Sequence, residues 1–414
     1  MANIIETKAI QVFDSRGIPT ISCKIILDDG TEGVAMVPSG ASTGSKEALE
    51  LRDGEKEYLG KGVLKAVHNI NNILGPLITG KNPIEQQLID EILIKSDGTD
   101  DKSEYGANAI LAISLAVSHS ASASNGSNLH EHFAHLYSKI HGKEIDQSIP
   151  MPMLNILNGG EHANNNIDIQ EFMIVPSGAS SFSQAMQWST EVYMNLKKII
   201  EKFGYSSAVG DEGGFAPNLK NNEEALKLII SAIIGSDLEP GKDINIALDC
   251  AASEFYDGKK YILKGEDKIF SSEKLVEYLI DLVDKYPIIS IEDGMDENDI
   301  DGWELLTEKI GEKCQLVGDD LFVTNKKILQ DGIEKNIANA ILIKFNQVGT
   351  ITETIQTIAC ANENGYKSII SHRSGETEDT TISDLAAGLG VGQIKTGAPC
   401  RSDRVSKYNR LLWI

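Results

Sequence analysis

The 414-residue sequence is poor in cysteine and in basic residues. Its five cysteines are scattered and form no C-x-x-C pair, which argues against a zinc framework or a disulfide scaffold and predicts free thiols in a reducing compartment. We therefore expect a cytoplasmic protein. Lysine and arginine total 38 against 61 acidic residues, a net charge of −23. So acidic a surface argues against direct nucleic-acid partners and against anionic membranes.

The sequence also lacks a long apolar run. Its most apolar window, Ala107–Val117, is too short to span a bilayer and predicts a buried helix instead. In the N-terminal segment MANIIETKAI, Glu6 and Lys8 interrupt the apolar residues, so we expect neither a signal peptide nor an anchor. The overall composition, 41% hydrophobic and 24% charged, is typical of a globular chain long enough for two domains.

The first third of the chain predicts a small α+β domain. Two β-rich segments precede three helical ones: Ile18–Leu27, Glu32–Pro38, Val63–Leu74, Glu85–Ile94 and Ala107–Ser118. A polar stretch, His130–Gln147, then leads into a strand in IPMPMLNIL. We place the boundary near residue 140, which gives an N-terminal capping domain at 1–138 and a second domain at 139–414.

In the second domain, short apolar strands alternate with helical segments, and each strand ends in polar residues. Six such strands are predicted: Ile244–Asp249, Ile288–Asp293, Gln315–Asp320, Ala340–Lys344, Ser368–His372 and Gln393–Thr396. Their charged ends are 43, 27, 25, 28 and 23 residues apart, close to the length of a βα unit. The pattern predicts a closed α/β barrel with its active site where the C-terminal ends of the strands converge.

Three of these strand ends carry carboxylates, Asp249, Glu292 and Asp319. Hard oxygen ligands without a nearby histidine or cysteine favour Mg²⁺ over zinc or iron. Two lysines follow, Lys344 in ILIKF and Lys395 in QIKTG. Two ammonium groups and a divalent ion in a partly desolvated site should lower the pKa of a lysine, so that one of the two can act as a base.

Three further motifs are ambiguous by themselves. The glycine-rich turn GDEGGFAP can aim Glu212 as an acid, although acidic turns are usually just solvated. NGGEHANNNIDIQEF places His162, Gln170 and Glu171 on a loop and a strand start. The loop Ser39–Gly44 resembles anion-binding loops but lacks the full phosphate-loop spacing, which favours a flexible lid.

Two other motifs are interpreted as structural. The tract HEHFAHLYSKIH would need a histidine at Ala134 to match the zincin spacing, so we expect the polar face of a helix. The glycines of AGLGVGQ follow a helical stretch and not a strand, which argues against a dinucleotide site.

Taken together, long motifs resemble the enolase family (phosphopyruvate hydratases) in its bacterial form, from near the N-terminus to Arg410. These motifs are SGASTGSKEALELRDG, LNILNGGEHANNNIDIQEFMIVP, GDEGGFAPNL, ALDCAASEF, SIEDGMDENDIDGW, LVGDDLFVTN, ILIKFNQVGT, SHRSGETEDT and QIKTGAPCRSDR. The resemblance implies an α+β capping domain before an eight-stranded, TIM-like α/β barrel whose first strands pair antiparallel. It also implies the reversible, Mg²⁺-dependent dehydration of 2-phospho-D-glycerate to phosphoenolpyruvate in glycolysis and gluconeogenesis.

The resemblance further implies a role for each matching residue. Lys344 is the base that takes the C2 proton, Glu212 is the acid that assists hydroxide departure from C3, and Glu171 supports it. Two Mg²⁺ ions are expected in each active site, the second arriving with the substrate. The metal positions are Asp249, Glu292 and Asp319 for the first ion and Ser42, on the mobile loop, for the second. The substrate-contacting positions are His162, Gln170, Lys344, His372, Arg373, Ser374 and Lys395.

The family also suggests a homodimer, sometimes assembled into an octamer. Partners in RNA degradation or at the cell surface, with a minor secreted fraction, are implied by resemblance only. Two alternatives stay open. Another enolase-superfamily dehydratase would share the barrel and metal carboxylates but would not be expected to keep the GDEGG turn and the SHRSGETED segment. A non-catalytic scaffold or surface-binding role could coexist with catalysis.

Overall fold

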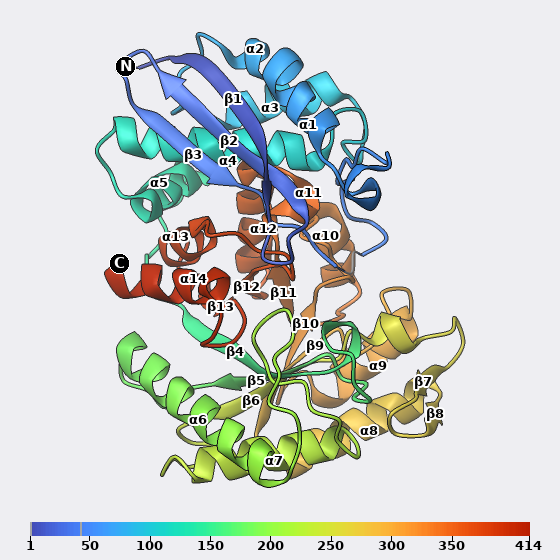
Figure 1. Ribbon diagram of the computed structural model, residues 1–414. Coiled ribbons are helices and arrows are strands. Elements are labelled where there is room, and N and C mark those ends of the chain that lie inside the picture. The colour runs from blue at the N-terminus through green and yellow to red at the C-terminus, as the bar shows by residue number, and fades with distance from the viewer. Residues whose placement is uncertain (1, 42–43) are drawn as a thin grey trace.

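The computed structural model describes residues 2–41 and 44–414 (Figure 1). At one end of the molecule, a three-stranded antiparallel sheet in the order β1–β2–β3 packs against helices. The elements of this part are β1 (Ile4–Phe13), β2 (Pro19–Leu27), β3 (Glu32–Met36), η1 (Glu57–Gly60), α1 (Leu64–Asn69), η2 (Ile70–Leu74), α2 (Gly75–Ile78), α3 (Gln86–Asp97), α4 (Ala107–Ser124) and α5 (Leu129–His141). The predicted strands and helices of this region are present, and the α+β class is confirmed.

The sequence analysis missed β1. This strand lies at the edge of the sheet and pairs only with β2 among the described strands. Its exposed residues include apolar ones, such as Ile5, Ile10 and Phe13, so apolar and polar positions do not alternate as they do in a half-buried strand. The predicted strand Glu32–Pro38 also ends earlier, at Met36.

Helix α4 is the central support of the N-terminal sheet. The predicted buried window Ala107–Val117 forms the first part of this helix, and every side chain in the window is buried. Strand β3 approaches α4 closely at Gly33, where an added Cβ would lie 2.2 Å from the Ser120 backbone nitrogen. Only glycine fits this approach. Within residues 2–41 and 44–414, no helix combines the length and apolarity that a membrane crossing requires.

The second part of the chain forms the closed barrel that the strand spacing predicted. The strands follow one another around the barrel in the order β10–β11–β12–β13–β4–β5–β6–β9. The barrel strands are β4 (Met151–Asn158), β5 (Glu171–Val175), β6 (Asn245–Asp249), β9 (Ile288–Glu292), β10 (Gln315–Gly318), β11 (Ala340–Ile343), β12 (Lys367–Ser371) and β13 (Gly392–Lys395). Between β6 and β9 lies a small hairpin of β7 (Tyr261–Leu263) and β8 (Lys268–Phe270).

Helices follow most barrel strands along the chain. They are α6 (Phe182–Lys202), α7 (Asn222–Ile234), α8 (Ser272–Lys285), α9 (Ile300–Ile310), α10 (Lys326–Glu334), α11 (Phe345–Val348), α12 (Ile351–Glu363), α13 (Thr381–Gly388) and α14 (Ser402–Trp413), with short turns η3 (Gly160–His162) and η4 (Ala252–Phe255). The AGLGVGQ glycines follow a helical stretch, as expected: Gly388 ends α13, Gly390 lies in the turn, and Gly392 begins β13. The HEHFAH tract is part of α5.

One barrel strand runs in the opposite direction. Strand β5 pairs antiparallel with both β4 and β6, whereas the other neighbouring pairs are parallel. This is the variant topology that the family resemblance implied. Because β5 is reversed, its first residue, Glu171, lies at the end of the barrel where the other strands finish. Glu171 faces Asp249 of β6, and Asp249 faces Glu292 of β9, as Cα partners across three strands.

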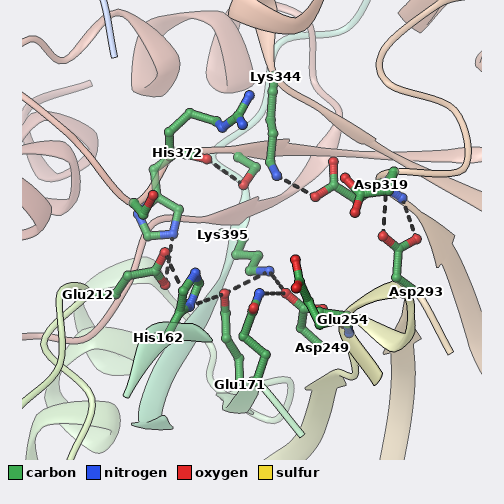
Figure 2. A pocket seen from close by; sticks show the side chains of 16 residues that line it. His162, Glu171, Glu212, Asp249, Glu254, Asp293, Asp319, Lys344, His372 and Lys395 are labelled. Carbon is green, nitrogen blue, oxygen red and sulfur yellow. Dashed lines mark hydrogen bonds and ion pairs between the residues drawn. The ribbon is translucent and has the colours of Figure 1, made fainter. Parts of the chain in front are cut away.

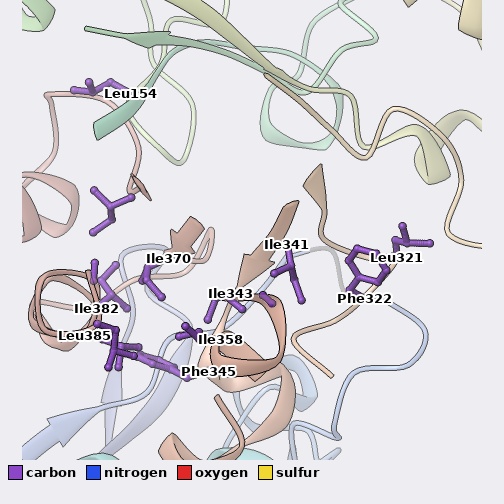
Figure 3. Packing of buried hydrophobic residues seen from close by; sticks show 14 of the residues in the cluster. Leu154, Leu321, Phe322, Ile341, Ile343, Phe345, Ile358, Ile370, Ile382 and Leu385 are labelled. Carbon is purple, nitrogen blue, oxygen red and sulfur yellow. The ribbon is translucent and has the colours of Figure 1, made fainter. Parts of the chain in front are cut away.

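The apolar strand sequences are explained by burial on both faces. On β11, Ala340 and Leu342 belong to the apolar cluster inside the barrel, while Ile341 and Ile343 belong to the larger cluster between barrel and helices. Figure 3 shows part of this outer layer, including Ile358 of α12. Side chains alternate between the two faces of a strand, so the run AILI supplies both layers at once.

A buried polar network joins the N-terminal helices to the barrel helix α12. The Asp90 carboxylate on α3 accepts from the Thr352 backbone nitrogen at 3.1 Å and from the Thr352 hydroxyl at 2.6 Å. Gln86 donates to Asp90 at 3.1 Å, and the Ser114 hydroxyl accepts from the Ile351 nitrogen at 3.0 Å. These bonds satisfy backbone N–H groups of the first turn of α12, which would otherwise lack partners.

The proposed division at 1–138 and 139–414 would cut α5, which ends at His141. We therefore propose that the boundary lies at 142–150, where the described chain forms neither helix nor strand. The polar stretch His130–Gln147 covers most of this segment, but its first part also buries Phe133 and Leu136 on one helical face.

The burial of Asp90 leads to a testable prediction about how stability depends on pH. Burial raises the pKa of Asp90 to about 6, against hydrogen bonds from Thr352 that lower it. A raised folded-state pKa contributes stability below the unfolded-state value, and this contribution is lost as the pH rises through about 6. Asp90→Asn keeps a neutral hydrogen-bonding group at every pH. Relative to wild type, its free energy of unfolding should therefore increase by about 1–2 kcal/mol between pH 5 and pH 8.

Urea denaturation at a series of pH values measures this difference. Glu91→Gln, on the same helix but partly exposed, is the control and should differ from wild type by a nearly constant amount. Parallel stability curves for wild type and Asp90→Asn would show that Asp90 does not titrate in this range.

Candidate active site

A polar pocket opens at the end of the barrel where most strands finish. All predicted site residues except Glu292 and Ser42 line it, and Figure 2 shows their side chains pointing inward from several strands. Ser42 lies outside the described residues. Glu292 lies just beneath the pocket, in contact with the Lys395 side chain. The fold therefore brings together the residues that the strand-end pattern singled out.

Lys395 lies at the centre of the carboxylates. Its Nζ is 3.0 Å from Asp249 Oδ2, 2.9 Å from Glu292 Oε1 and 3.2 Å from Glu171 Oε1. Gln170 adds a donor to Asp249 Oδ2 at 3.3 Å. All five side chains are buried. Burial lowers the pKa of Lys395, but the surrounding carboxylates outweigh it and hold that pKa well above its usual value, so the lysine is a fixed cation.

Lys344 extends from the end of β11 to the Asp319 carboxylate, with which it forms an ion pair. Asp319 also accepts from Gln347 Nε2 at 2.9 Å. The sequence analysis predicted a lowered pKa for a lysine at this site. In the ion pair, burial lowers the pKa of Lys344, but the charge of Asp319 outweighs burial and raises it overall. The lowered pKa expected when a divalent ion binds Asp319 stays a prediction. Lys344 can act as a base only when Asp319 no longer pairs with it.

The donor set fits a hard divalent cation. Asp249, Glu292 and Asp319 offer buried carboxylate oxygens, the ligands that Mg²⁺ prefers. The pKa of Glu292 is raised well above its usual range, by burial and then by the charge of Asp249. This crowding of like charges is the condition that a bound cation relieves. The three do not form one of the tightest oxygen clusters among the described residues, where Asp319 groups instead with Asp293 and Asp320 within 4.8 Å.

Glu212 occupies a different wall of the pocket. Asn155 Nδ2 donates to Glu212 Oε2 at 3.1 Å, and His372 Nε2 lies 3.2 Å from the same oxygen. His162 Nδ1 is 3.7 Å from Glu212 Oε1 and 3.3 Å from Glu171 Oε1. Burial raises the pKa of Glu212, but the two histidines outweigh burial and hold that pKa well below its usual range. Glu212 is therefore ionised, and Oε1 is the oxygen left to carry a proton.

Glu171 and His162 complete this wall. Burial and the charge of Glu212 raise the pKa of Glu171, partly offset by Lys395. Burial lowers the pKa of His162, but Glu212 and Glu171 raise it to about 9 overall. His162 is therefore a cation between two carboxyl groups. Because the three groups interact, a proton can be held by His162, Glu171 or Glu212.

The GDEGG turn is held against the barrel by backbone contacts. The Gly210 nitrogen donates to the Gly214 carbonyl at 2.8 Å, which closes the turn. The next residue, Phe215, exchanges backbone hydrogen bonds with β4, through the carbonyl of Ile156 and the nitrogen of Asn158. These contacts place Glu212 in a buried position, so the alternative interpretation of a solvated acidic turn is excluded.

The opposite end of the pocket is suited to an anion. The buried Arg373 guanidinium makes a bidentate ion pair with Glu47, through NH1 to Oε2 at 3.0 Å and NH2 to Oε1 at 3.2 Å. The Ser374 hydroxyl accepts from the Ala41 nitrogen at 2.6 Å. Glu47 and Ala41 belong to the N-terminal part of the chain, which therefore supplies one wall of the site.

Sequence reasoning missed several residues that hold this arrangement. Asp293 accepts from the backbone nitrogens of Asp319 and Asp320, both at 2.9 Å. Gln347 connects Asp319 to Glu47, to which its Nε2 donates at 3.3 Å. Asp293 and Gln347 are immediate or near neighbours of predicted residues in SIEDG and ILIKFNQ, and a search of those flanks would have found them. Asn155, on the inner face of β4, had no such signal.

The comparison with protein families agrees with this geometry. Residues 4–133 match the family described as enolase, N-terminal domain, and residues 146–414 match enolase, C-terminal TIM barrel domain. The two matches cover nearly the whole chain. The chain belongs to the enolase family, and its activity is the dehydration of 2-phosphoglycerate to phosphoenolpyruvate.

Proposed function

We propose that Lys344 removes the C2 proton of 2-phosphoglycerate and that Glu212 assists departure of the C3 hydroxide, with Glu171 supporting it. The observation that carries this assignment is the placement of the two groups in one pocket. Lys344 and Glu212 enter from different walls, and Lys395 lines the same pocket with the carboxylates of Glu171 and Asp249 (Figure 2). A base and an acid so separated can act on different carbons of a small substrate.

The rest of the pocket matches the charges of this substrate. Arg373 and Ser374 form the end suited to the phosphate, with Glu47 orienting the guanidinium. We assign the remaining substrate contacts to His162, Gln170, His372 and Lys395. When bound at Asp249, Glu292 and Asp319, Mg²⁺ would supply the positive charge that acidifies the C2 proton.

Proton handling at the two walls follows from the contacts. Lys344 needs to be released from Asp319 before Nζ can accept a proton. Glu212 needs a proton on Oε1 before it can act as an acid, because Oε2 already accepts from Asn155 and lies 3.2 Å from His372 Nε2. Glu171 and the His162 imidazolium lie beside Oε1 and are the groups able to exchange a proton with it.

The second Mg²⁺ stays a prediction, as do the bacterial type, the cytoplasmic location and any secreted, scaffold or cell-surface role. We propose that two ions bind in each active site and that the second, completed by Ser42, arrives with the substrate. Gly44, the last residue of the loop Ser39–Gly44, supports a coupling between this loop and the substrate site. Its nitrogen donates to Glu47 Oε1 at 3.1 Å, and Glu47 forms an ion pair with Arg373.

We also propose a homodimer, with an octamer as a further possibility. Strand β1 exposes Ile5, Ile10 and Phe13, each more than half exposed, and α14 exposes Trp413 at 86%. Exposed large apolar side chains of this kind are typical of surfaces that bind a partner.

The assignment of base and acid can be tested by following two reactions of the same substrate. Lys344→Ala should lower turnover by roughly 100- to 10,000-fold and should also stop exchange of the C2 proton with solvent, because no base remains near C2. Glu212→Gln should block phosphoenolpyruvate formation but permit C2 exchange, since proton removal stays reversible without loss of hydroxide. The measurement is the C2 proton signal of 2-phosphoglycerate in D₂O by NMR, with Mg²⁺ saturating.

Wild type is the reference for both reactions, and phosphoenolpyruvate formation is followed by its ultraviolet absorbance. Exchange that persists in Lys344→Ala but vanishes in Glu212→Gln would reverse the two roles. Loss of exchange in both variants would contradict the separation of the steps.

The metal assignment predicts different effects for two ligands. Asp319→Ala should weaken Mg²⁺ binding in the absence of substrate by more than about tenfold, because a full negative charge is lost. Ser42→Ala should leave this binding nearly unchanged, because its oxygen is neutral and serves the substrate-dependent ion. Calorimetric titration with Mg²⁺ measures both, and metal removal should abolish activity. Equal weakening by the two substitutions would refute the assignment of Ser42.

The proposed dimer predicts a sedimentation mass of about twice 45.0 kDa for the purified chain. Sedimentation velocity at micromolar concentration tests this mass. Phe13→Ser, at the exposed end of β1, should shift the distribution toward the monomer. A monomeric wild type would contradict the proposal.

A further inference from the structure

Arg404 is a buried cation that the proposed reaction does not use. It lies on α14, its side chain is fully buried, and its guanidinium reaches the two segments that carry Glu212 and His372. Arginine has five N–H donors in a rigid fork, keeps its charge at any physiological pH and cannot accept a hydrogen bond. Each partner of Arg404 is therefore an acceptor.

The partners of Arg404 come from the two segments that carry Glu212 and His372. NH1 donates to His372 Nδ1 at 2.5 Å and to the Arg373 carbonyl at 2.6 Å. NH2 donates to the Ser374 carbonyl at 2.5 Å and to the Asp211 carbonyl at 3.3 Å. Nε lies 2.8 Å from Asp403 Oδ2. Arg404 thus joins the residue before Glu212 to the segment His372–Ser374.

The packing around Arg404 is close. Gly397 has a φ of +80°, and an added Cβ there would lie 2.9 Å from Arg404 Cδ and 2.8 Å from the Glu212 carbonyl. The next nitrogen, of Ala398, donates to that same carbonyl at 2.9 Å. The glycine lets the arginine stem lie directly beside the backbone of Glu212.

The contact with His372 decides which ring nitrogen carries the proton. Because NH1 can only donate, Nδ1 must present its lone pair. The proton of a neutral ring then lies on Nε2, which is the nitrogen 3.2 Å from Glu212 Oε2. We infer that Arg404 is a positioning residue that fixes the neutral Nε2–H form of His372 and so places a ring N–H group beside Glu212.

This inference has a consequence for the acid. With His372 in this form, its ring N–H lies 3.2 Å from Glu212 Oε2 without the alignment of a hydrogen bond, and Asn155 donates to the same oxygen at 3.1 Å. Oε1 has neither contact and is the oxygen available for proton transfer. Burial lowers the pKa of His372 to about 3, with Arg404 adding to the effect against Glu212, in agreement with a neutral ring. The catalytic consequence rests on the proposed role of Glu212, but the protonation state of the ring does not.

The first test needs no substitution of Arg404. In protein labelled with ¹⁵N-histidine, the His372 ring should show one pyridine-like nitrogen, Nδ1, and one pyrrole-like nitrogen, Nε2. The signals are assigned by their loss in His372→Gln. A pyrrole-like Nδ1, or two protonated nitrogens, would overturn the inference whether or not the proposed mechanism holds.

The second test compares the same substitution at two places on α14. Arg404→Lys keeps the charge but loses the fork, so we expect kcat to fall roughly 10- to 100-fold, with a smaller change in KM, and the His372 spectrum to lose its single form. Arg410→Lys is the matched control, because Arg410 pairs with Asp384 away from the pocket, and its kcat should stay at the wild-type value.

Two results of this comparison would refute a positioning role. One is an unchanged kcat and His372 spectrum in Arg404→Lys. The other is a lowered kcat with an unchanged spectrum, which would show that Arg404 acts on the fold and not through His372. If Arg404→Lys does not fold, the wild-type spectrum still decides the assignment of the ring proton.

Discussion

The active-site carboxylates depend on ion pairs with the buried ammonium group of Lys395, which offset their mutual repulsion. Asp249, Glu292 and Glu171 are Cα partners on adjacent strands, so the barrel forces their charges together. Two carboxylates about 4 Å apart repel by about 4 kcal/mol at an effective dielectric constant near 20. Lys395 lies on β13, the strand that closes the barrel against β4, and its position next to these carboxylates therefore requires closure. Closure of the barrel therefore places a cation among the three carboxylates and offsets part of their charge.

The N-terminal part of the chain is likewise integral to the site. Glu47 orients Arg373, and the Ala41 nitrogen fixes the Ser374 hydroxyl. On the opposite side of the same barrel region, Asp90 and Ser114 bond the start of α12, which follows the segment of Lys344 in the chain. The N-terminal part is therefore bonded to the barrel at two places, at Arg373 and at the start of α12 just after the segment of Lys344.

The sequence predicted the barrel and most of its site because strand ends in a barrel converge whatever the details of the loops. Asp249, Glu292, Asp319, Lys344, His372 and Lys395 were each found at the end of an apolar strand, and that pattern depends only on burial of both strand faces. Glu171 had only an ambiguous signal, because it begins a strand that runs the other way. Its role came from the family resemblance.

What the sequence could not predict depends on packing between distant segments. The edge strand β1 lacks an alternating pattern, and the supports Glu47, Asn155 and Arg404 act through partners far away in the chain. The sequence also could not predict the ion pair between Lys344 and Asp319, which raises the pKa of Lys344 against its burial. Residue type predicts which groups meet, but their protonation depends on which pairs are in contact.

The reversal of β5 also changes how the chain connects consecutive elements at the mouth of the barrel. In a fully parallel barrel, each connection at this end leads to a helix on the outside. Here the segment from β4 to β5 stays at the mouth, and strands fix it at both of its ends. His162 and Gln170 therefore lie on a connection between two neighbouring barrel strands, whereas His372 and Arg373 lie on a connection that leads to a helix. The direction of one strand thus builds the two walls of one pocket from different kinds of connection.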